Sequence, residues 1–347
     1  MPTMDTVLDD NQDNPPLLKM LLGGDSKDGK NWYGALAAID NLNILHLDGD
    51  VGSQTVGKMV REGVLTREQG SRILILDMKD KVLAGDRQPT FWDDMFTFIS
   101  STKGFFWNDA EGRVAIRSKD HDKPLLKIET NKLDHNTLLI IDSWTALTES
   151  IMMKCAGEAG IDLMSATMSD MRPIYQGSSL RATEMLRIIR SLPCHCIVLA
   201  HPDEYQHKVA PEGKKVGAVS ERDLLIAYTK KIPKTTSKPQ GLQMGKYFSD
   251  VAWITKDSRG KRMIDFTPNP DRIGGGHFDG IKSVEEYSIA NLIRAIGGQL
   301  PSQPQPMAWL TKLQPGEAFP APPVLDGTKS QTATGKGLSG FAMKPSA

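Results

Sequence analysis

Two glycines and a lysine near the start of the chain have the spacing of a phosphate-binding loop. Residues 21–31 read Leu-Leu-Gly-Gly-Asp-Ser-Lys-Asp-Gly-Lys-Asn, so that Gly24, Gly29 and Lys30 match the pattern G-x-x-x-x-G-K. Glycines let backbone N–H groups point inward at phosphate oxygens, and a following helix directs its positive end at the same anion. Lys30 would reach the β- and γ-phosphates. The residues expected around a triphosphate are Gly24, Asp25, Ser26, Lys27, Asp28, Gly29, Lys30 and Asn31.

Asn31 departs from this pattern, because the residue after the lysine is ordinarily a Ser or Thr whose hydroxyl binds Mg²⁺. An amide oxygen also binds hard cations, so Asn31 remains a candidate metal ligand. The alternative is a Gly- and Asp-rich turn with no ligand. An apolar run before the loop and a plausible helix after it favour the phosphate site.

Three apolar runs end in polar residues that could act on such a phosphate. Residues 138–141 end in Asp142, and an acid at the carboxyl end of a buried strand can hold Mg²⁺. Residues 42–47 lead to Asp50 through Asp48 and Gly49, and residues 196–200 end in His201, which could sense the γ-phosphate. An ordinary Asp-Gly turn and an unrelated histidine are the alternatives for Asp50 and His201.

A basic region follows His201. Residues 205–246 contain nine Lys or Arg and three Asp or Glu, whereas the whole chain balances 42 basic against 42 acidic residues. Any contact with nucleic acid must therefore come from such a local patch. We expect a mobile basic loop here, with a solvated surface loop as the alternative. The candidate DNA contacts are Lys208, Lys214, Lys215, Arg222, Lys230 and Lys231.

The elements that would position these residues alternate between apolar runs and amphipathic segments. Continuous apolar runs predict strands buried on both faces, so we expect an α/β fold with a mostly parallel twisted sheet flanked by helices. A basic turn between two short strands predicts a C-terminal β-hairpin. The expected strands are 17–22, 42–47, 73–76, 138–141 and 196–200, the helices 31–40, 53–69, 151–157, 180–192 and 284–296, and the hairpin 251–255 with 262–266.

The composition of the chain ends and the number of cysteines predict the domain boundaries and the cellular compartment. We expect a flexible lead over 1–15, one domain over 16–298 with an insertion at 88–135, and a disordered Pro-, Gly-, Ser- and Thr-rich tail over 299–347. The three cysteines are sparse and odd in number, which predicts buried free thiols in a reducing cytoplasm. No apolar run reaches membrane-spanning length, and the polar N-terminus is not a secretory signal.

The ordered set of motifs resembles the RecA-like P-loop NTPase core, and most closely the bacteriophage Sak4-like single-strand annealing proteins, also described as AAA-family ATP-binding proteins. The resemblance covers roughly residues 16–296. It is carried by the loop at 24–30, the strand ends at 47–50, 140–143 and 198–201, and the closing segment at 246–262.

The resemblance implies ATP and Mg²⁺ as cofactors, with Lys30 on the phosphates and Asn31 and Asp142 on the metal. Asp50 stands where the family has the glutamate that polarises the attacking water, and His201 stands at the sensor position. The shorter base and the missing hydroxyl imply slow, DNA-dependent hydrolysis. Cations inserted by a neighbouring subunit would be Lys256, Arg259, Lys261 and Arg262.

The implied partners are single-stranded DNA, further copies of the chain in a ring or filament, and a single-strand-binding protein. Recombination or strand annealing in a phage-infected cell is the implied function. The alternative is a structural or regulatory nucleotide-binding phage protein with a degenerate site and no DNA binding.

Overall fold

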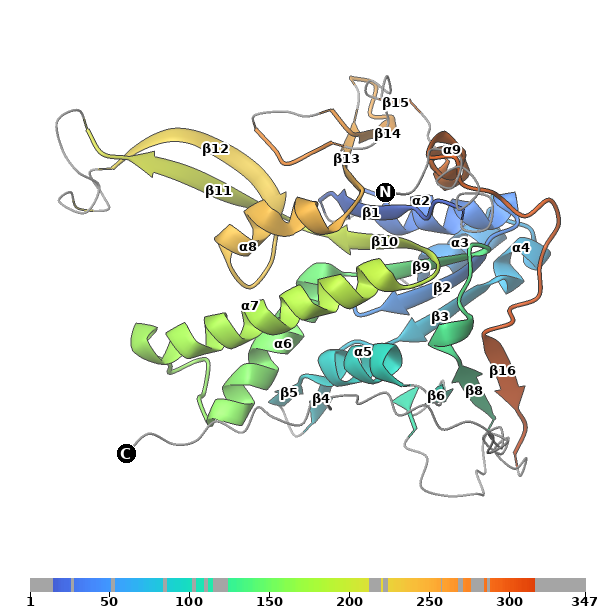
Figure 1. The fold of residues 1–347 in the computed structure, drawn as a ribbon, viewed down its shortest axis with the longest axis horizontal. Helices are drawn as coiled ribbons and strands as arrows, with labels where there is room; N and C mark the ends of the chain where they lie inside the picture. The colour runs from blue at the N-terminus through green and yellow to red at the C-terminus, as the bar shows by residue number, and fades with distance from the viewer. Residues whose placement is uncertain are drawn as a thin grey trace, which may run out of the picture.

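An eight-stranded sheet forms the centre of the protein in the computed structural model (Figure 1). Its order is β15-β14-β13-β1-β10-β9-β2-β3, and the six strands from β13 to β3 run parallel. Their bounds are β1 Lys19–Gly23, β2 Asn43–Asp48, β3 Ile73–Asp77, β9 Thr137–Asp142, β10 His195–Ala200, β13 Asp250–Lys256, β14 Arg262–Asp265 and β15 Val284–Glu285. The structure describes residues 15–25, 28–50, 54–83, 86–101, 104–108, 112–114, 124–211, 220, 224–256, 258–267, 271–275, 284–285 and 288–315.

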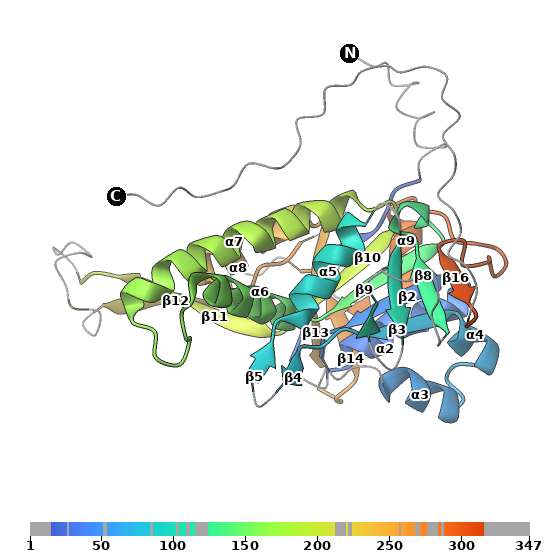
Figure 2. The same ribbon diagram turned by 90° about the horizontal axis from the view of Figure 1, so that it is seen from below.

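Helices cover both faces of this sheet, which explains why its central strands read as unbroken apolar runs. In β1, Met20 and Leu22 pack into one hydrophobic cluster and Leu21 into the other, as the alternation of side chains along a strand requires. One face is covered by α2 (Lys30–Leu36), its continuation η1 (Ala37–Asp40) and α9 (Ile289–Ala295). The other is covered by α5 (Thr90–Ser100), α6 (Trp144–Ala159) and α7 (Met168–Ser191), seen together in Figure 2. The predicted α/β architecture is confirmed.

The segment predicted as an insertion packs against the same core as the main sheet. It follows the hairpin of β4 (Lys81–Leu83) and β5 (Asp86–Gln88), and it contains α5, η2 (Thr130–Lys132) and three strands of a small antiparallel sheet. These are β6 (Phe105–Asn108), β7 (Gly112–Arg113) and β8 (Leu125–Ile128), in the order β16-β8-β6-β7. Phe105 and Trp107 of β6 are buried in the cluster that also holds α5 and α6.

The fourth strand of this small sheet corrects the predicted disordered tail. β16 (Leu310–Leu313) pairs with β8, and Trp309 beside it is only 1% exposed. The Trp309 indole N–H donates to Thr137 Oγ1 at 3.0 Å, and the Glu129 N–H donates to the Trp309 carbonyl at 2.9 Å. The prediction is therefore wrong for 299–315, because one large side chain anchors a segment that is otherwise poor in apolar groups. Residues 316–347, and 1–14 of the predicted lead, lie outside the described residues.

The basic region also differs from its prediction. Residues 205–209 and 225–233 of this region belong to a β-hairpin of β11 (Pro202–Val209) and β12 (Leu225–Pro233) that projects from the main sheet (Figure 1). It is followed by α8 (Lys238–Gln243) and η5 (Met244–Tyr247). The run Leu-Ile-Ala-Tyr-Thr-Lys-Lys-Ile at 225–232 is rich in strand-forming residues, a signal that the count of charges obscured.

The boundaries of four predicted helices differ from expectation. The helix predicted at 53–69 is two helices, α3 (Gln54–Arg61) and α4 (Arg67–Ser71), the second of which begins with a capping box at Thr66. The last helix begins at Ile289 rather than 284, where Ser288 caps it. α6 and α7 are longer than predicted. None of the helices in the described part of the chain is both long and apolar enough to cross a membrane.

Candidate functional site

The loop at residues 24–30 joins the carboxyl end of β1 to the start of α2. Gly29 is in the left-handed conformation, with φ of 92°, at the position that caps α2. Glycine adopts this conformation without steric cost, so the second glycine of the motif is explained by the backbone. Asp28 stabilises the loop from inside, because its carboxylate accepts a hydrogen bond from the Asp25 N–H at 2.8 Å. Ser26 and Lys27 lie outside the described residues.

The side chain of Lys30 lies inside this loop. Its ammonium group donates to the carbonyls of Gly24 and Asp25 at 2.8 and 2.9 Å, and the residue is 7% exposed. Burial lowers the pKa of Lys30, while the charges of Asp142 and Asp28 act in the opposite direction. The lysine can therefore exchange two loop carbonyls for phosphate oxygens without leaving its place.

The two predicted metal ligands meet beside the loop. Asn31, in the first turn of α2, donates from Nδ2 to Asp142 Oδ2 at 2.7 Å. Asp142 is the last residue of β9 and is 3% exposed. Asn31 Oδ1 makes no hydrogen bond to any residue that the structure describes, so this oxygen is available to a cation.

The two predicted catalytic side chains also meet. His201 Nε2 lies 3.0 Å from Asp50 Oδ2, a contact between residues that follow β10 and β2 on either side of β9. The hydrogen bond to His201 lowers the pKa of Asp50, against the opposing effect of burial. The backbone N–H of His201 donates to Thr145 Oγ1 at 3.1 Å, and this hydrogen bond holds the end of β10 against α6. Asp50 is thus kept ionised at the edge where a phosphate would lie.

Two of the cations expected from a neighbouring subunit lie against the loop of the same chain. Lys256 Nζ is 2.9 Å from Asp28 Oδ1, and a Cβ built on Gly29 would lie 3.1 Å from Arg262 Nε. They come from β13 and β14, which are held there because β13 pairs with β1. Arg259 and Lys261 lie in the exposed turn between these strands. Insertion into another subunit stays a prediction for all four.

A cavity of about 660 Å³ opens beside the loop, between α2 and the β13–β14 hairpin. Aromatic side chains of α2 form one wall and basic side chains of the hairpin form the other. The two aromatic residues, Trp32 and Tyr33, directly follow Asn31 but match no motif that predicts a role for them. The lining residues are Trp32, Tyr33, Leu36, Lys256, Gly260, Lys261, Arg262 and Ser288.

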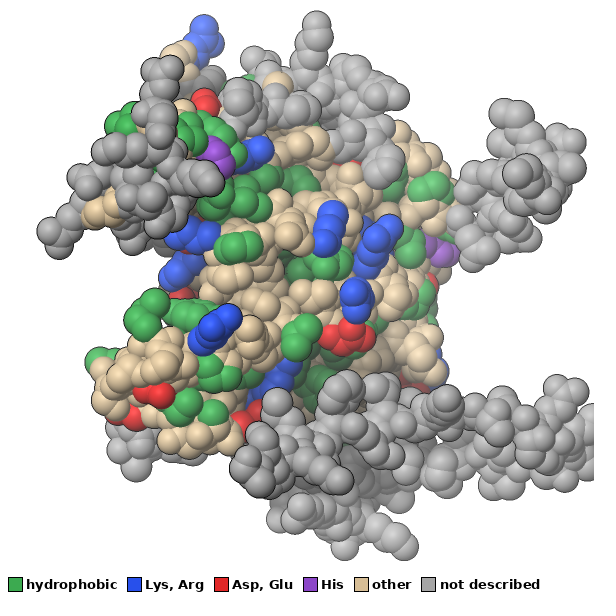
Figure 3. Space-filling model, turned by 60° about the vertical axis from the view of Figure 1, so that its left-hand side comes forward, with side chains coloured by type: hydrophobic (Ala, Val, Ile, Leu, Met, Phe, Trp, Pro, Cys, Tyr) green, Lys and Arg blue, Asp and Glu red, His purple; other side chains and the backbone are tan. Residues whose placement is uncertain are grey.

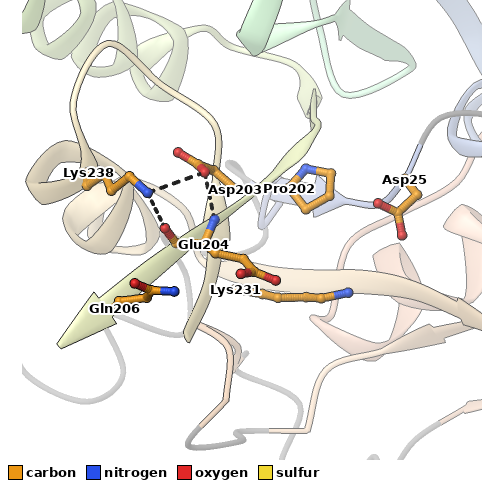
Figure 4. Close-up of a pocket in the computed structure, with 7 residues that line it drawn as sticks. All are labelled: Asp25, Pro202, Asp203, Glu204, Gln206, Lys231 and Lys238. Carbon is orange, nitrogen blue, oxygen red and sulfur yellow. Dashed lines mark hydrogen bonds and ion pairs between the residues drawn. The ribbon is translucent and has the colours of Figure 1, made fainter. Parts of the chain in front are cut away.

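A second cavity, of about 510 Å³, lies between the loop and the base of the β11–β12 hairpin (Figure 4). Lys238 of α8 lies 3.7 Å from Asp203 and also donates to the carbonyl of Glu204. Asp25 and Lys231 face the same space, so this cavity links the loop at residues 24–30 to the basic hairpin.

Basic and aromatic side chains share the hairpin. Lys208 lies on β11 and Lys230 and Lys231 on β12, whereas Lys214, Lys215 and Arg222 lie outside the described residues. His207 stacks on Tyr228 with ring centroids 4.9 Å apart, and Tyr228 is 48% exposed. Lys and Arg side chains on the face in Figure 3 are interspersed with hydrophobic ones rather than gathered into one basic patch. A count of charges along the sequence gives no signal for this aromatic pair, whose members are 21 positions apart.

Comparison with known proteins supports no further conclusion about this chain. No protein-family model matches the chain, and no curated protein is significantly similar to it. Among solved structures, the chain is similar to the crystal structure of the RadB recombinase, with 12% identity over 71% of this chain and 79% of that one. The TM-score of 0.30 is too low to support an argument about fold or function.

Proposed function

We propose that this chain is a RecA-like ATP-binding protein that hydrolyses ATP slowly with Mg²⁺. The observation that carries the proposal is the Lys30 ammonium group, held inside a glycine loop between a parallel strand and a helix. Loops of this kind at the carboxyl ends of parallel strands bind phosphate through backbone N–H groups and the helix dipole. The support is therefore local geometry rather than similarity to a named protein.

The residues beside the loop fit a magnesium ion. Asn31 Oδ1 and Asp142 are hard oxygen ligands, and the amide oxygen makes no hydrogen bond within the described residues. Bound Mg²⁺ would neutralise phosphate charge. Asp50 would accept the proton of the attacking water while His201 holds the carboxylate in place. Because an amide replaces the hydroxyl and Asp50 is one methylene shorter than Glu, we expect slow turnover.

Positive charge at the phosphates comes from the same chain in this proposal. Lys256 and Arg262 are close enough to the loop to stabilise a triphosphate once it displaces the contact with Asp28. The adjoining cavity, with Trp32 and Tyr33 on its wall, has room for the nucleoside.

The β11–β12 hairpin is the proposed contact with single-stranded DNA. Lysines would bind the phosphate backbone, and the exposed Tyr228 beside His207 offers a ring on which a base can stack. Because Asp25 and Lys231 line one cavity, ATP bound at the loop would lie close enough to affect the position of the hairpin. Assembly on the strand, a single-strand-binding partner and a role in phage recombination or annealing belong to the same proposal. A nucleotide-binding structural or regulatory protein without DNA binding is the second candidate.

Calorimetric titration with Mg-ATP tests the nucleotide site. Lys30→Ala should abolish binding, because the ammonium group inside the loop is removed. Lys58→Ala is the matched control, since this exposed lysine of α3 pairs only with Glu62 among the described residues and should change nothing. Equal affinity in wild type and Lys30→Ala would refute the assignment of the loop.

Filter binding to labelled single-stranded DNA over a range of salt concentrations tests the hairpin. Replacing Tyr228, Lys230 and Lys231 by Ala should weaken binding on every sequence, and each DNA phosphate that is no longer neutralised should flatten the salt slope by about 0.7. Lys58→Ala combined with Lys132→Ala, two exposed lysines elsewhere, is the control. If the triple variant binds both DNA and ATP like wild type, the hairpin is not the DNA contact and the second candidate function is favoured.

A further inference from the structure

Three buried side chains converge on the neighbouring strands β2 and β9. β10 separates β9 from β1, the strand that leads into the loop at residues 24–30. His46, Asp48 and Asp142 are 2%, 1% and 3% exposed, and one ligand atom from each lies within 4.8 Å of the others. The arrangement follows from the sheet. His46 and Asp48 are two residues apart on β2 and so share a face, and the parallel register places Asp48 opposite Asp142.

The His46 imidazole has an unused nitrogen that faces this group. Its Nε2 makes no hydrogen bond to any residue in the described part of the chain and lies 3.6 Å from Asp142 Oδ2. A buried polar atom without a hydrogen-bond partner is energetically unfavourable. Two ligands bound to one ion at about 2.1 Å with tetrahedral geometry lie roughly 3.4 Å apart. The His46–Asp142 spacing therefore matches that of two ligands on a common metal.

Asn31, which the proposed function assigns to nucleotide-bound Mg²⁺, can add a fourth ligand while no nucleotide is bound. Its Nδ2 donates a hydrogen bond to Asp142 Oδ2, and its Oδ1 makes no hydrogen bond to the described residues. Rotation of this amide by half a turn would present the oxygen instead of the N–H group to an ion beside Asp142.

We propose that His46, Asp48 and Asp142 bind one divalent transition-metal ion. One imidazole and two carboxylates suit Mn²⁺, Zn²⁺ or Co²⁺, whereas Mg²⁺ is usually held by carboxylates, phosphate oxygens and water. All three ligands come from the protein, so binding requires no nucleotide. The site goes beyond the proposed ATP-binding function and would stand if that function were wrong.

His195 provides the matched comparison. It is also a fully buried strand histidine whose Nε2 makes no hydrogen bond within the described residues. Its Nδ1 accepts the Leu18 N–H at 2.9 Å, and it belongs to no described cluster of potential metal ligands. A loss of metal binding in a His46 variant but not in a His195 variant would therefore reflect ligation rather than damage to the sheet.

The test uses the full chain, freed of metal with EDTA and kept free of nucleotide. Titration with Mn²⁺, followed by the electron paramagnetic resonance signal of the free ion, should show one equivalent bound. His46→Leu should weaken this binding at least tenfold, and His195→Leu should leave it unchanged. Co²⁺ should give a visible absorption band in wild type and in His195→Leu that is absent from His46→Leu. If His46→Leu does not fold, Asp48→Asn provides the same test with a nearly isosteric change.

The proposal is overturned if nucleotide-free wild type takes up neither Mn²⁺ nor Co²⁺, or if His46→Leu and Asp48→Asn bind them like wild type. Uptake of Mn²⁺ only in the presence of ATP would also overturn it, because the ion would then belong to the nucleotide. Lys30→Ala separates the two proposals, since it should lose ATP but keep the protein-held metal.

Discussion

Removing the Trp309 side chain tests how firmly the C-terminal segment is held to the core. Trp309→Ala deletes an indole that is 1% exposed and that packs in the cluster containing α5, α6 and β6. It also removes the hydrogen bond to Thr137 Oγ1, which bridges residues 172 positions apart. A chain ending at Gly298 lacks both of these interactions and β16 as well.

The expected loss of stability follows from the buried area. A buried tryptophan removes about 150–250 Å² from water, which at about 25 cal/mol per Å² corresponds to roughly 4–6 kcal/mol as an upper bound. Trp→Ala changes in protein cores cost about 3–5 kcal/mol, so we expect about 4 kcal/mol for Trp309→Ala. Trp309→Phe keeps most of the apolar packing and should cost about 1–2 kcal/mol, chiefly the hydrogen bond to Thr137.

Urea unfolding and thermal melting followed by far-ultraviolet circular dichroism measure these differences. For a domain of this size each kcal/mol shifts the Tm by about 2 °C, so Trp309→Ala should melt roughly 8 °C below wild type. A chain ending at Pro315 keeps every interaction described for Trp309 and β16 and serves as the control for the chain ending at Gly298. Equal melting temperatures for these two chains would refute the argument that Trp309 anchors the segment.

Two further predictions concern the phosphate site and the small sheet. Asn31→Thr combined with Asp50→Glu should speed phosphate release in single-turnover assays, because it restores the hydroxyl and lengthens the base; a slower double variant would contradict this. Burial raises the pKa of Asp94 from 3.8 to about 6 despite its ion pair with Arg113. The folded state therefore binds this proton more tightly, and stability falls as pH rises from about 4 to 7, by about 3 kcal/mol. Asp94→Asn should lack that fall in urea unfolding, whereas Asp93→Asn should retain it.

The strands of the main sheet could be predicted because their signal is local. Leu138, Leu139, Ile140 and Ile141 are all buried in β9, and their run of apolar side chains requires cover on both faces. The positions of Asn31 and Asp142 followed from the same reasoning, since the loop and the strand end lie at one edge of the sheet. Local pattern thus accounts for the sheet and for the contact at its edge.

Long-range partners could not be predicted in the same way. No local pattern near Trp309 predicts its hydrogen bonds with Thr137 and Glu129. Composition alone therefore predicts disorder for this Pro-rich segment. The convergence of His46 with Asp142 depends on the pairing of β2 with β9, which no spacing along the chain specifies. The period-two spacing of His46 and Asp48 was a usable signal, because it places both side chains on one face of a strand.

The last described segment closes both hydrophobic clusters of the protein. Ile289, Leu292 and Ile293 of α9 complete the cluster on one face of the sheet, and Trp309 completes the cluster on the other. At about 5–20 residues per second, a ribosome needs roughly 15–60 s to extend the chain from β1 to residue 313, and neither cluster is complete until α9 or Trp309, respectively, has been made. A nascent chain that lacks this segment therefore leaves both clusters partly exposed to water. A late nonsense mutation should yield an aggregation-prone product rather than a slightly shorter working protein.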